Sequence, residues 1–100
     1  MEQQKFYEKV INGTRATLTK YINFEQISQH LIQDGIITPA ECEVIMGGPH
    51  SSNMHRMPAF FDILIRKDLM ITYHKFKTII REQFPVAFAS MEAEEKKKNG

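Results

Sequence analysis

The sequence predicts an all-α protein built as a six-helix antiparallel bundle. Apolar residues recur at intervals of three and four along nearly the whole chain of 100 residues, which is the spacing of one helix face. No segment alternates apolar and polar residues over the length of a strand. Short segments rich in glycine, proline or polar residues separate the periodic stretches, so we expect six helices of about 8–16 residues joined by tight turns.

The first helix is expected to be bent or split near its middle. Its apolar stripe begins with Phe6 and Val10, is interrupted at Asn12-Gly13, and resumes at Leu18. An Asn-Gly pair inside a helix costs roughly 1 kcal/mol or more relative to good helix formers. The pair therefore predicts a weak point in this helix.

Cap signals mark the second and third helices. Asn23 is placed to cap the second helix, and Gly35 suits the left-handed position that follows its end. Residues 38–41 (TPAE) form a capping-box pattern with proline at the first helical position. This pattern predicts a short third helix that continues through Met46.

The last three helices are marked by prolines and turns. A loop from Gly47 leads to the fourth helix, where Asn53 is a candidate cap and Pro58 is expected in the first turn. A turn at Asp68 precedes the fifth helix, and Pro85 starts the sixth. The expected core residues of these helices are Met57, Phe60, Phe61, Leu64, Ile65, Tyr73, Phe76, Ile79, Ile80, Val86, Phe88 and Met91.

The end of the chain differs in composition from the rest. Residues 92–100 (EAEEKKKNG) are too polar to pack against a core. We therefore expect a helical domain over residues 1–91, followed by a polar tail or linker over residues 92–100.

The charges are sorted into blocks along the chain. Between Tyr21 and His55 there is no lysine or arginine, and four acids give this stretch a net charge of −4: Glu25, Asp34, Glu41 and Glu43. Residues 1–20 hold four bases against two acids, and residues 56–81 hold six bases against two acids, although the whole chain sums to only +1. Such blocks predict one basic and one acidic face, which attract each other between copies or between relatives.

Residue types that bind metals or catalyse reactions are not grouped in the sequence. Cys42 is the only cysteine and is flanked by two acids, which disfavour a reactive thiolate. The histidines lack the paired spacing of structural zinc ligands: His30, His50, His55 and His74. Gly47-Gly48 lacks the spacing and the following lysine of a phosphate-binding loop. We therefore expect no enzymatic activity, no bound metal and no cofactor.

Location is inferred from what the sequence lacks. No apolar run approaches the ~20 residues that a membrane-spanning helix needs. The first residues, MEQQKFYEKV, do not follow the basic-then-apolar pattern of a signal peptide. With a single cysteine and therefore no intrachain disulfide, we expect a cytoplasmic protein.

Two segments resemble caspase recruitment domains (CARDs) of the death-fold superfamily. The run YINFEQISQHLIQDGIITPAECEVI is similar to the second and third helices of these domains, and FFDILIRKDLMITYHKFKTII to their leucine-rich fourth helix, basic turn and aromatic fifth helix. The resemblance covers roughly residues 5–91 and is nearest to the apoptosome adaptor and to the CARD–coiled-coil scaffolds. The chain departs from the common pattern at Asp68-Leu69, where many members have glycine, and at Pro58.

The resemblance implies a Greek-key death fold and homotypic binding in apoptotic or innate immune and inflammatory signalling. Such a domain binds another CARD or associates with copies of itself into a helical assembly. A basic surface on the first and fourth helices meets an acidic surface on the second and third. Carried onto this chain, the basic face comprises Arg15, Lys20, Arg56 and Lys67. The acidic face comprises Glu25, Asp34, Glu41 and Glu43. This contact leaves Lys75, Lys77 and Arg81 without a role.

Two other functions remain open at this point. A small helical nucleic-acid-binding domain would contact phosphates through the basic residues of the second half: Arg56, Arg66, Lys67 and Lys75. The modest pI of about 7.9 and the acidic block oppose binding to a nucleic-acid backbone. An inert structural domain, whose charges serve solubility alone, would stay monomeric at all concentrations.

Overall fold

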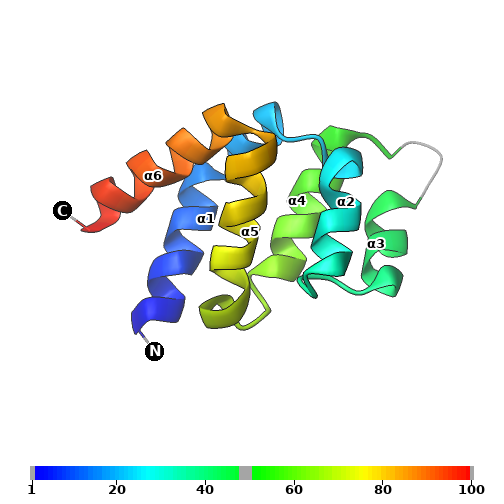
Figure 1. The fold of residues 1–100 in the computed structure, drawn as a ribbon, viewed down its shortest axis with the longest axis horizontal. Coiled ribbons are helices and arrows are strands. Elements are labelled where there is room, and N and C mark those ends of the chain that lie inside the picture. The colour runs from blue at the N-terminus through cyan, green and yellow to red at the C-terminus, as the bar shows by residue number, and fades with distance from the viewer. Residues whose placement is uncertain (1, 48–50, 100) are drawn as a thin grey trace.

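Six α-helices make up the computed structural model, which describes residues 2–47 and 51–99 of the chain. In chain order they are α1 (Glu2–Tyr21), α2 (Phe24–Gln33), α3 (Pro39–Met46), α4 (Asn53–Leu64), α5 (Leu69–Gln83) and α6 (Pro85–Asn99) (Figure 1). Within those two ranges there is no strand, so the predicted all-α helical bundle is confirmed.

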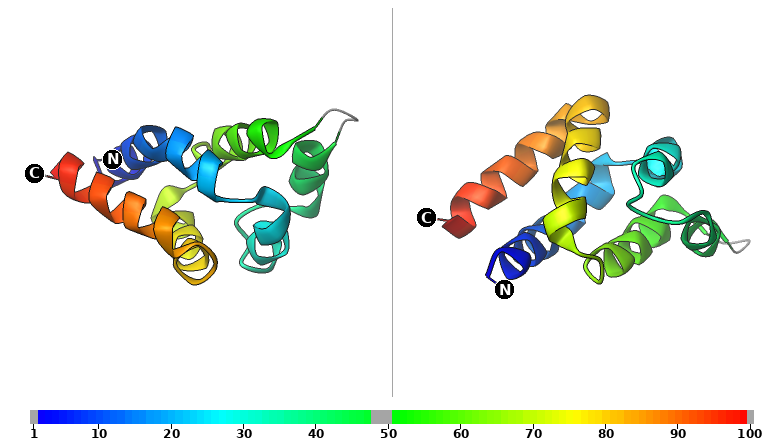
Figure 2. Two further views of the ribbon diagram at one scale, coloured as in Figure 1. Left: turned by 90° about the horizontal axis from the view of Figure 1, so that it is seen from above. Right: turned by 60° about the horizontal axis from the view of Figure 1, so that its bottom comes forward.

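The helices are arranged along an elongated body with extents of 43 × 25 × 21 Å. α1 and α6 lie side by side at one end, α2 and α3 lie at the other, and α4 and α5 lie between them (Figures 1 and 2). α1 begins and α6 ends at the same end of the body. The molecule therefore has two distinct ends, built from different parts of the chain.

Aromatic side chains join the middle helices into one core. The ring of Phe60 on α4 lies 5.7 Å from that of Phe24 on α2 and 5.4 Å from that of Phe76 on α5, measured between ring centroids. All three side chains are fully buried. Large buried rings dominate the apolar area that a small domain removes from water, so these contacts hold the two ends of the body together.

The predicted cap signals of α2 and α3 are confirmed. The Thr38 hydroxyl accepts a hydrogen bond from the Glu41 amide at 3.1 Å, and the Glu41 carboxylate accepts one from the Thr38 amide at 2.9 Å. Asn23 caps α2 by accepting from the Gln26 amide at 3.2 Å. Gly35 has a φ of +73°, the left-handed conformation in which glycine carries no steric penalty. The predicted stop of α3 at Gly48 and Pro49 lies outside the described residues, although α3 does end at Met46.

The expected split of the first helix is wrong. α1 continues without a break through Asn12 and Gly13. The reason is tertiary packing, because α1 contacts α4, α5 and α6 and buries Val10, Ile11 and Leu18 on either side of the pair. This packing outweighs the roughly 1 kcal/mol propensity cost of glycine. Gly13 itself is exposed, next to the flexible carboxylate end of Glu94 on α6.

Asn53 does not act as the expected cap of α4. Ser52 occupies the N-cap position, and Asn53 is the first helical residue. Its side-chain amide instead binds the chain between α1 and α2. It accepts a hydrogen bond from the Phe24 amide at 2.8 Å and donates to the carbonyls of Thr19 at 3.1 Å and Ile22 at 2.7 Å. One side chain therefore satisfies three backbone groups on the other side of the core.

Pro58 also lies elsewhere than predicted. It is inside α4, beyond the first turn in which we expected it. Because proline has no N–H, the helix lacks the hydrogen bond that residue 58 would otherwise donate to the carbonyl of Met54. α4 begins at Asn53, so Pro58 is its sixth residue.

Residues 92–99 continue α6, in contrast to the expected polar tail or linker. Ala87 and Met91 are fully buried on this helix, whereas Val86, which we expected in the core, is 60% exposed. Two of the polar residues that follow Met91, Glu92 and Glu95, bind Lys77 of α5, and Glu94 pairs with Lys98 within α6. The amino-acid composition predicted a tail because it does not show which residues of other helices bind these charged side chains.

Candidate protein-interaction surfaces

The acidic block of the sequence forms one end of the molecule, which we call the acidic end and define as residues 24–46. It comprises α2, α3 and the turn between them, and it contains no lysine or arginine. The described lysines and arginines lie on α1, α4, α5, α6 and the turn after α4. α2 and α3 lie together at one end of the body (Figure 1), so the acidic block of the sequence is also one region of the structure.

Two of the four predicted acidic residues face solvent freely. Asp34 directly follows α2 and Glu43 lies on α3, and both are exposed. Val44, the neighbour of Glu43, is 77% exposed and is the most exposed of the large apolar side chains in the described structure. The acidic end therefore presents carboxylates next to an apolar side chain.

The other two acidic residues contact predicted basic residues of the same chain. Glu25 lies 3.6 Å from the guanidinium of Arg56, and Glu41 lies 2.7 Å from the ammonium of Lys67. Sequence reasoning had placed these partners on opposite faces. The packing of α2 and α3 against α4 and the following turn brings them together.

Glu41 is held more tightly than Glu25. Burial opposes ionisation of the Glu41 carboxyl, but hydrogen bonds from Lys67 and from the Thr38 backbone outweigh it and lower the pKa of Glu41 below its usual 4.5. The same carboxylate closes the capping box of α3. Glu25, by contrast, keeps 70% of its side chain exposed and is free to change partner.

The remaining predicted basic residues lie along α1. Arg15 pairs with Asp62 of α4 at 2.9 Å, and its guanidinium carbon lies 5.7 Å from the centre of the Phe61 ring. Lys20 is exposed, with its ammonium 5.7 Å from the centre of the Tyr21 ring. Of the four predicted basic residues, only Lys20 forms no ion pair within residues 2–47 and 51–98.

Beside Arg15 the surface is hollowed between α1 and α4. The depression has a volume of about 420 Å³ and is lined by Asn12, Arg15, Ala16, Thr19, Met54 and Pro58. Met54 is 76% exposed. The expected basic face therefore contains an apolar depression that sequence reasoning missed, although Met54 and Pro58 were visible as apolar residues outside the core stripe of α4.

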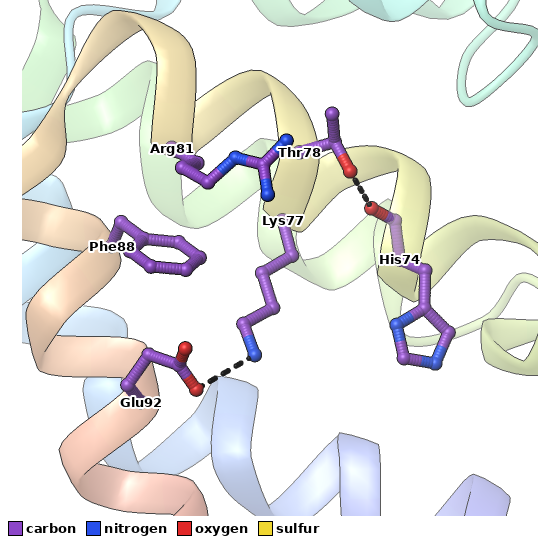
Figure 3. A pocket seen from close by; sticks show the side chains of 6 residues that line it. All are labelled: His74, Lys77, Thr78, Arg81, Phe88 and Glu92. Atoms are coloured by element: carbon purple, nitrogen blue, oxygen red, sulfur yellow. Dashed lines mark hydrogen bonds and ion pairs between the residues drawn. The ribbon is translucent and has the colours of Figure 1, made fainter.

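Lys77 links α5 to α6. Its ammonium lies 3.0 Å from Glu92 (Figure 3) and 2.8 Å from Glu95. Only 16% of the Lys77 side chain is exposed. Burial opposes the charge on Lys77, but the hydrogen bonds to Glu95 and Glu92 outweigh it and raise the pKa of the lysine. Lys77, for which the sequence suggested no role, thus anchors the polar half of α6.

Tyr73 and Tyr7 extend this cluster to α1. The Tyr73 hydroxyl donates to Glu95 at 2.6 Å, and burial together with this hydrogen bond strongly raises the pKa of Tyr73. Its ring stacks on that of Tyr7 at a centroid distance of 4.1 Å, and the Tyr7 hydroxyl lies 2.8 Å from Nε2 of His74. Three helices therefore share one hydrogen-bonded cluster.

Comparisons with protein-family models, with curated proteins and with solved structures found no match. Within the part of the chain that the structure describes, no three His, Cys, Asp or Glu side chains gather closely enough to hold a metal ion. None of the described helices combines the length and the apolar character needed to cross a membrane. The two ends of opposite charge are the most distinctive surface feature.

Proposed function

We propose that the chain is a homotypic protein-interaction module of the CARD type, acting in the cytoplasm. It binds another CARD, or further copies of itself, and recruits or nucleates a signalling assembly in apoptosis or in innate immune and inflammatory signalling. The proposal includes a Greek-key death fold and a first helix that is bent, without a break, near Gly13. Its support is the resemblance of residues 21–45 and 60–80 to that family, together with the six helices of the fold.

The observation that carries the proposal is the separation of charge between the two ends. The acidic end holds Glu25, Asp34, Glu41 and Glu43 without a single basic residue, and the expected basic surface lies on α1 and α4. Because the two surfaces lie on different parts of one body, a contact between them is heterologous. Such a contact propagates into an open helical assembly instead of closing as a dimer.

Some ion pairs within the chain must open before this contact forms. Arg56–Glu25 and Arg15–Asp62 are partly exposed, and such pairs contribute only about 0.2–1 kcal/mol each. Exchanging them for equivalent pairs with a second copy therefore costs little. A single contact is correspondingly weak, and stable assembly depends on several contacts for each subunit.

The acidic end opposes binding to nucleic acid, because its exposed carboxylates repel a phosphate backbone. Arg56 and Lys67, two of the four candidate phosphate contacts, already lie against carboxylates. A third, Lys75, donates to the backbone carbonyl of Asp34 at 3.2 Å. A gel-shift titration against duplex DNA separates the alternatives, since salt-sensitive retention of the DNA at micromolar protein would support the nucleic-acid function.

Charge reversal at the acidic end tests the proposal. Glu41 is unsuitable because it caps α3, and Arg56 because it pairs with Glu25, so we choose the exposed Asp34. We expect Asp34→Lys to weaken self-association about ten-fold or more in sedimentation equilibrium, because like charges then face each other across the contact. Glu2→Lys, which makes the same charge change on α1, is the matched control. Equal association by both variants and the wild type would contradict the proposal.

A further inference from the structure

The contact proposed above leaves the exposed bases of α5 unused. The structure gives the three bases of this helix different environments. Lys77 points inward to Glu92 and Glu95, and Lys75 donates to a backbone carbonyl. Arg81 is exposed and forms no ion pair or side-chain hydrogen bond with any described residue. All the N–H donors of its guanidinium are therefore available to a partner.

Arg81 borders a hollow between α5 and α6. The hollow has a volume of about 230 Å³ and is lined by His74, Lys77, Thr78, Arg81, Phe88 and Glu92 (Figure 3). Lys77 extends between Arg81 and His74 toward Glu92, and the half-buried Phe88 ring forms the wall on the α6 side. An adjoining hollow shares His74 and Lys77 and adds Lys96. Cationic groups thus lie around an aromatic wall.

Among the described residues, Arg81 is the one cation lining this hollow that is not bound to a carboxylate, because Glu92 and Glu95 offset the charge of Lys77. Glu92 and Glu95 both bind the ammonium of Lys77, at 3.0 and 2.8 Å. The exposed acid on α5 nearest in sequence is Glu82, next to Arg81. A guanidinium offers five N–H donors in a planar fork that suits a carboxylate. The hollow is therefore suited to a carboxylate that is accompanied by an apolar group.

α3 of the same protein carries this combination. Glu43 is exposed, and Val44 beside it is 77% exposed. α3 lies at the far end of the body from α6, so a chain does not fill its own hollow with its own α3 (Figure 1). Only another copy brings the two surfaces together.

We propose that the α5–α6 hollow is a second homotypic contact, which receives α3 of another copy with Glu43 against Arg81 and Val44 against Phe88. The inference rests on the proposed function, since it requires that copies of the chain associate. It assigns a partner to Glu43 and a role to Arg81. In this assembly Glu43 binds the hollow and Asp34, the other acid of the acidic end that faces solvent freely, binds the α1–α4 surface, so that each subunit contacts more than one neighbour.

A charge-swap experiment with the purified chain of residues 1–100 tests this contact. Arg81→Glu and Glu43→Lys are each expected to raise the dissociation constant of self-association about ten-fold in sedimentation equilibrium. An equimolar mixture of the two variants should recover to within about three-fold of wild type, because one combination restores the opposite charges. Thermal unfolding followed by circular dichroism verifies that both variants fold, as expected for exposed positions.

The variant Lys20→Glu distinguishes the α5–α6 contact from the α1–α4 contact of the proposed function. Lys20 lies on α1 and reports on the α1–α4 surface. If Arg81→Glu associates like wild type while Lys20→Glu is weakened, the hollow is not a contact although homotypic association stands. If Arg81→Glu is weakened and rescued by Glu43→Lys, the hollow is a contact whatever Lys20→Glu does. A wild-type chain that stays monomeric up to about 1 mM overturns both proposals.

Discussion

The two ends of this protein treat their charges in opposite ways. At the end formed by α1, α5 and α6, charged and phenolic groups bind one another across helices, as Lys77, Glu95 and Tyr73 do. At the acidic end, Asp34 and Glu43 face solvent and Glu25 is bound only loosely. Charges at the first end therefore stabilise the fold, whereas charges at the second are available to a partner.

Apolar burial does not explain this difference, since both ends contribute fully buried side chains to one core. The difference comes from which signs are available locally. α5 and α6 carry acids and bases that pair between the helices, whereas α2 and α3 carry acids alone. A surface of one sign is satisfied only by another surface, either of the same chain or of a partner. Substitution of charges bound within the chain, such as Lys77, should therefore affect stability, whereas substitution of exposed charges that are unpaired in the described structure, such as Asp34 and Arg81, should affect association.

The largest effect on stability is expected at the junction of the two ends, where Asn53 binds three backbone groups. Asn53→Ala removes all three hydrogen bonds and leaves partly buried groups of Phe24, Thr19 and Ile22 without a partner. We expect a loss of about 2–3 kcal/mol in the free energy of unfolding, measured by urea denaturation. Asn23→Ala removes a single exposed cap bond and should cost only about 1 kcal/mol. Equal costs would show that the Asn53 contacts do not join the ends.

A smaller effect is expected at the end whose charges are bound. Lys77→Met keeps much of the side-chain volume but leaves Glu92 and Glu95 close together without a cation. We expect a loss of about 1–2 kcal/mol in the free energy of unfolding. Lys75→Met, on the exposed side of the same helix, is the matched control and should change stability by less than about 0.5 kcal/mol. If both variants unfold at the same denaturant concentration, the anchoring role of Lys77 is wrong.

Lowering the pH should destabilise both ends of the molecule. Its effect for each carboxyl should be smaller than the effect of Asn53→Ala or Lys77→Met. The pKa values of Glu41 and Glu95 are lowered in the folded protein, since their hydrogen bonds outweigh the effect of burial. A depressed pKa in the folded state contributes stability that is present above the unfolded value, 4.5, and is lost as the pH falls through the folded value. We therefore expect the free energy of unfolding to fall as the pH drops below about 4.5, measured by urea denaturation across this range.

The variant Glu41→Gln measures how much of the stability lost at low pH comes from the acidic end. The variant should be less stable than wild type near neutral pH, because the amide binds Lys67 less well than the carboxylate does. It should lose less stability than wild type between about pH 6 and about pH 3, since one titrating group is gone. An unchanged acid dependence would place the loss elsewhere.

The sequence predicted the local features of the fold. The capping box at Thr38, the cap at Asn23 and the glycine turn at Gly35 depend on residues within four positions of each other, so their pattern is visible in the chain. Most of the core followed from the spacing of apolar residues. All of these correct predictions depend on residues that are close together in the sequence.

The predictions that were wrong concern contacts between distant residues. Gly13 predicted a break in α1 because the residues of α6 that lie beside it, such as Glu94, 81 positions away, are remote in the sequence. Residues 92–99 suggested a tail because the base that holds them, Lys77, belongs to α5. Asn53 suggested a cap because its partners around α2 are remote in sequence.

The placement of the predicted site residues followed the same rule. The sequence separated Arg56 from Glu25, and Lys67 from Glu41, into blocks of opposite sign. The folded chain brings each pair together by packing α2 and α3 against α4 and the turn that follows it. Charge blocks thus predicted that the molecule has an acidic end, but not which of its carboxylates are free.

The salt dependence of self-association is the most direct test of whether the acidic end binds the basic surface of another copy. Sedimentation equilibrium of the wild-type chain at about 50 mM and about 500 mM salt measures it, because screening shortens the range of exposed charges several-fold between these concentrations. We predict association at low salt that weakens about ten-fold or more at high salt. A chain that is monomeric at both concentrations, or that associates equally well at both, would contradict the account.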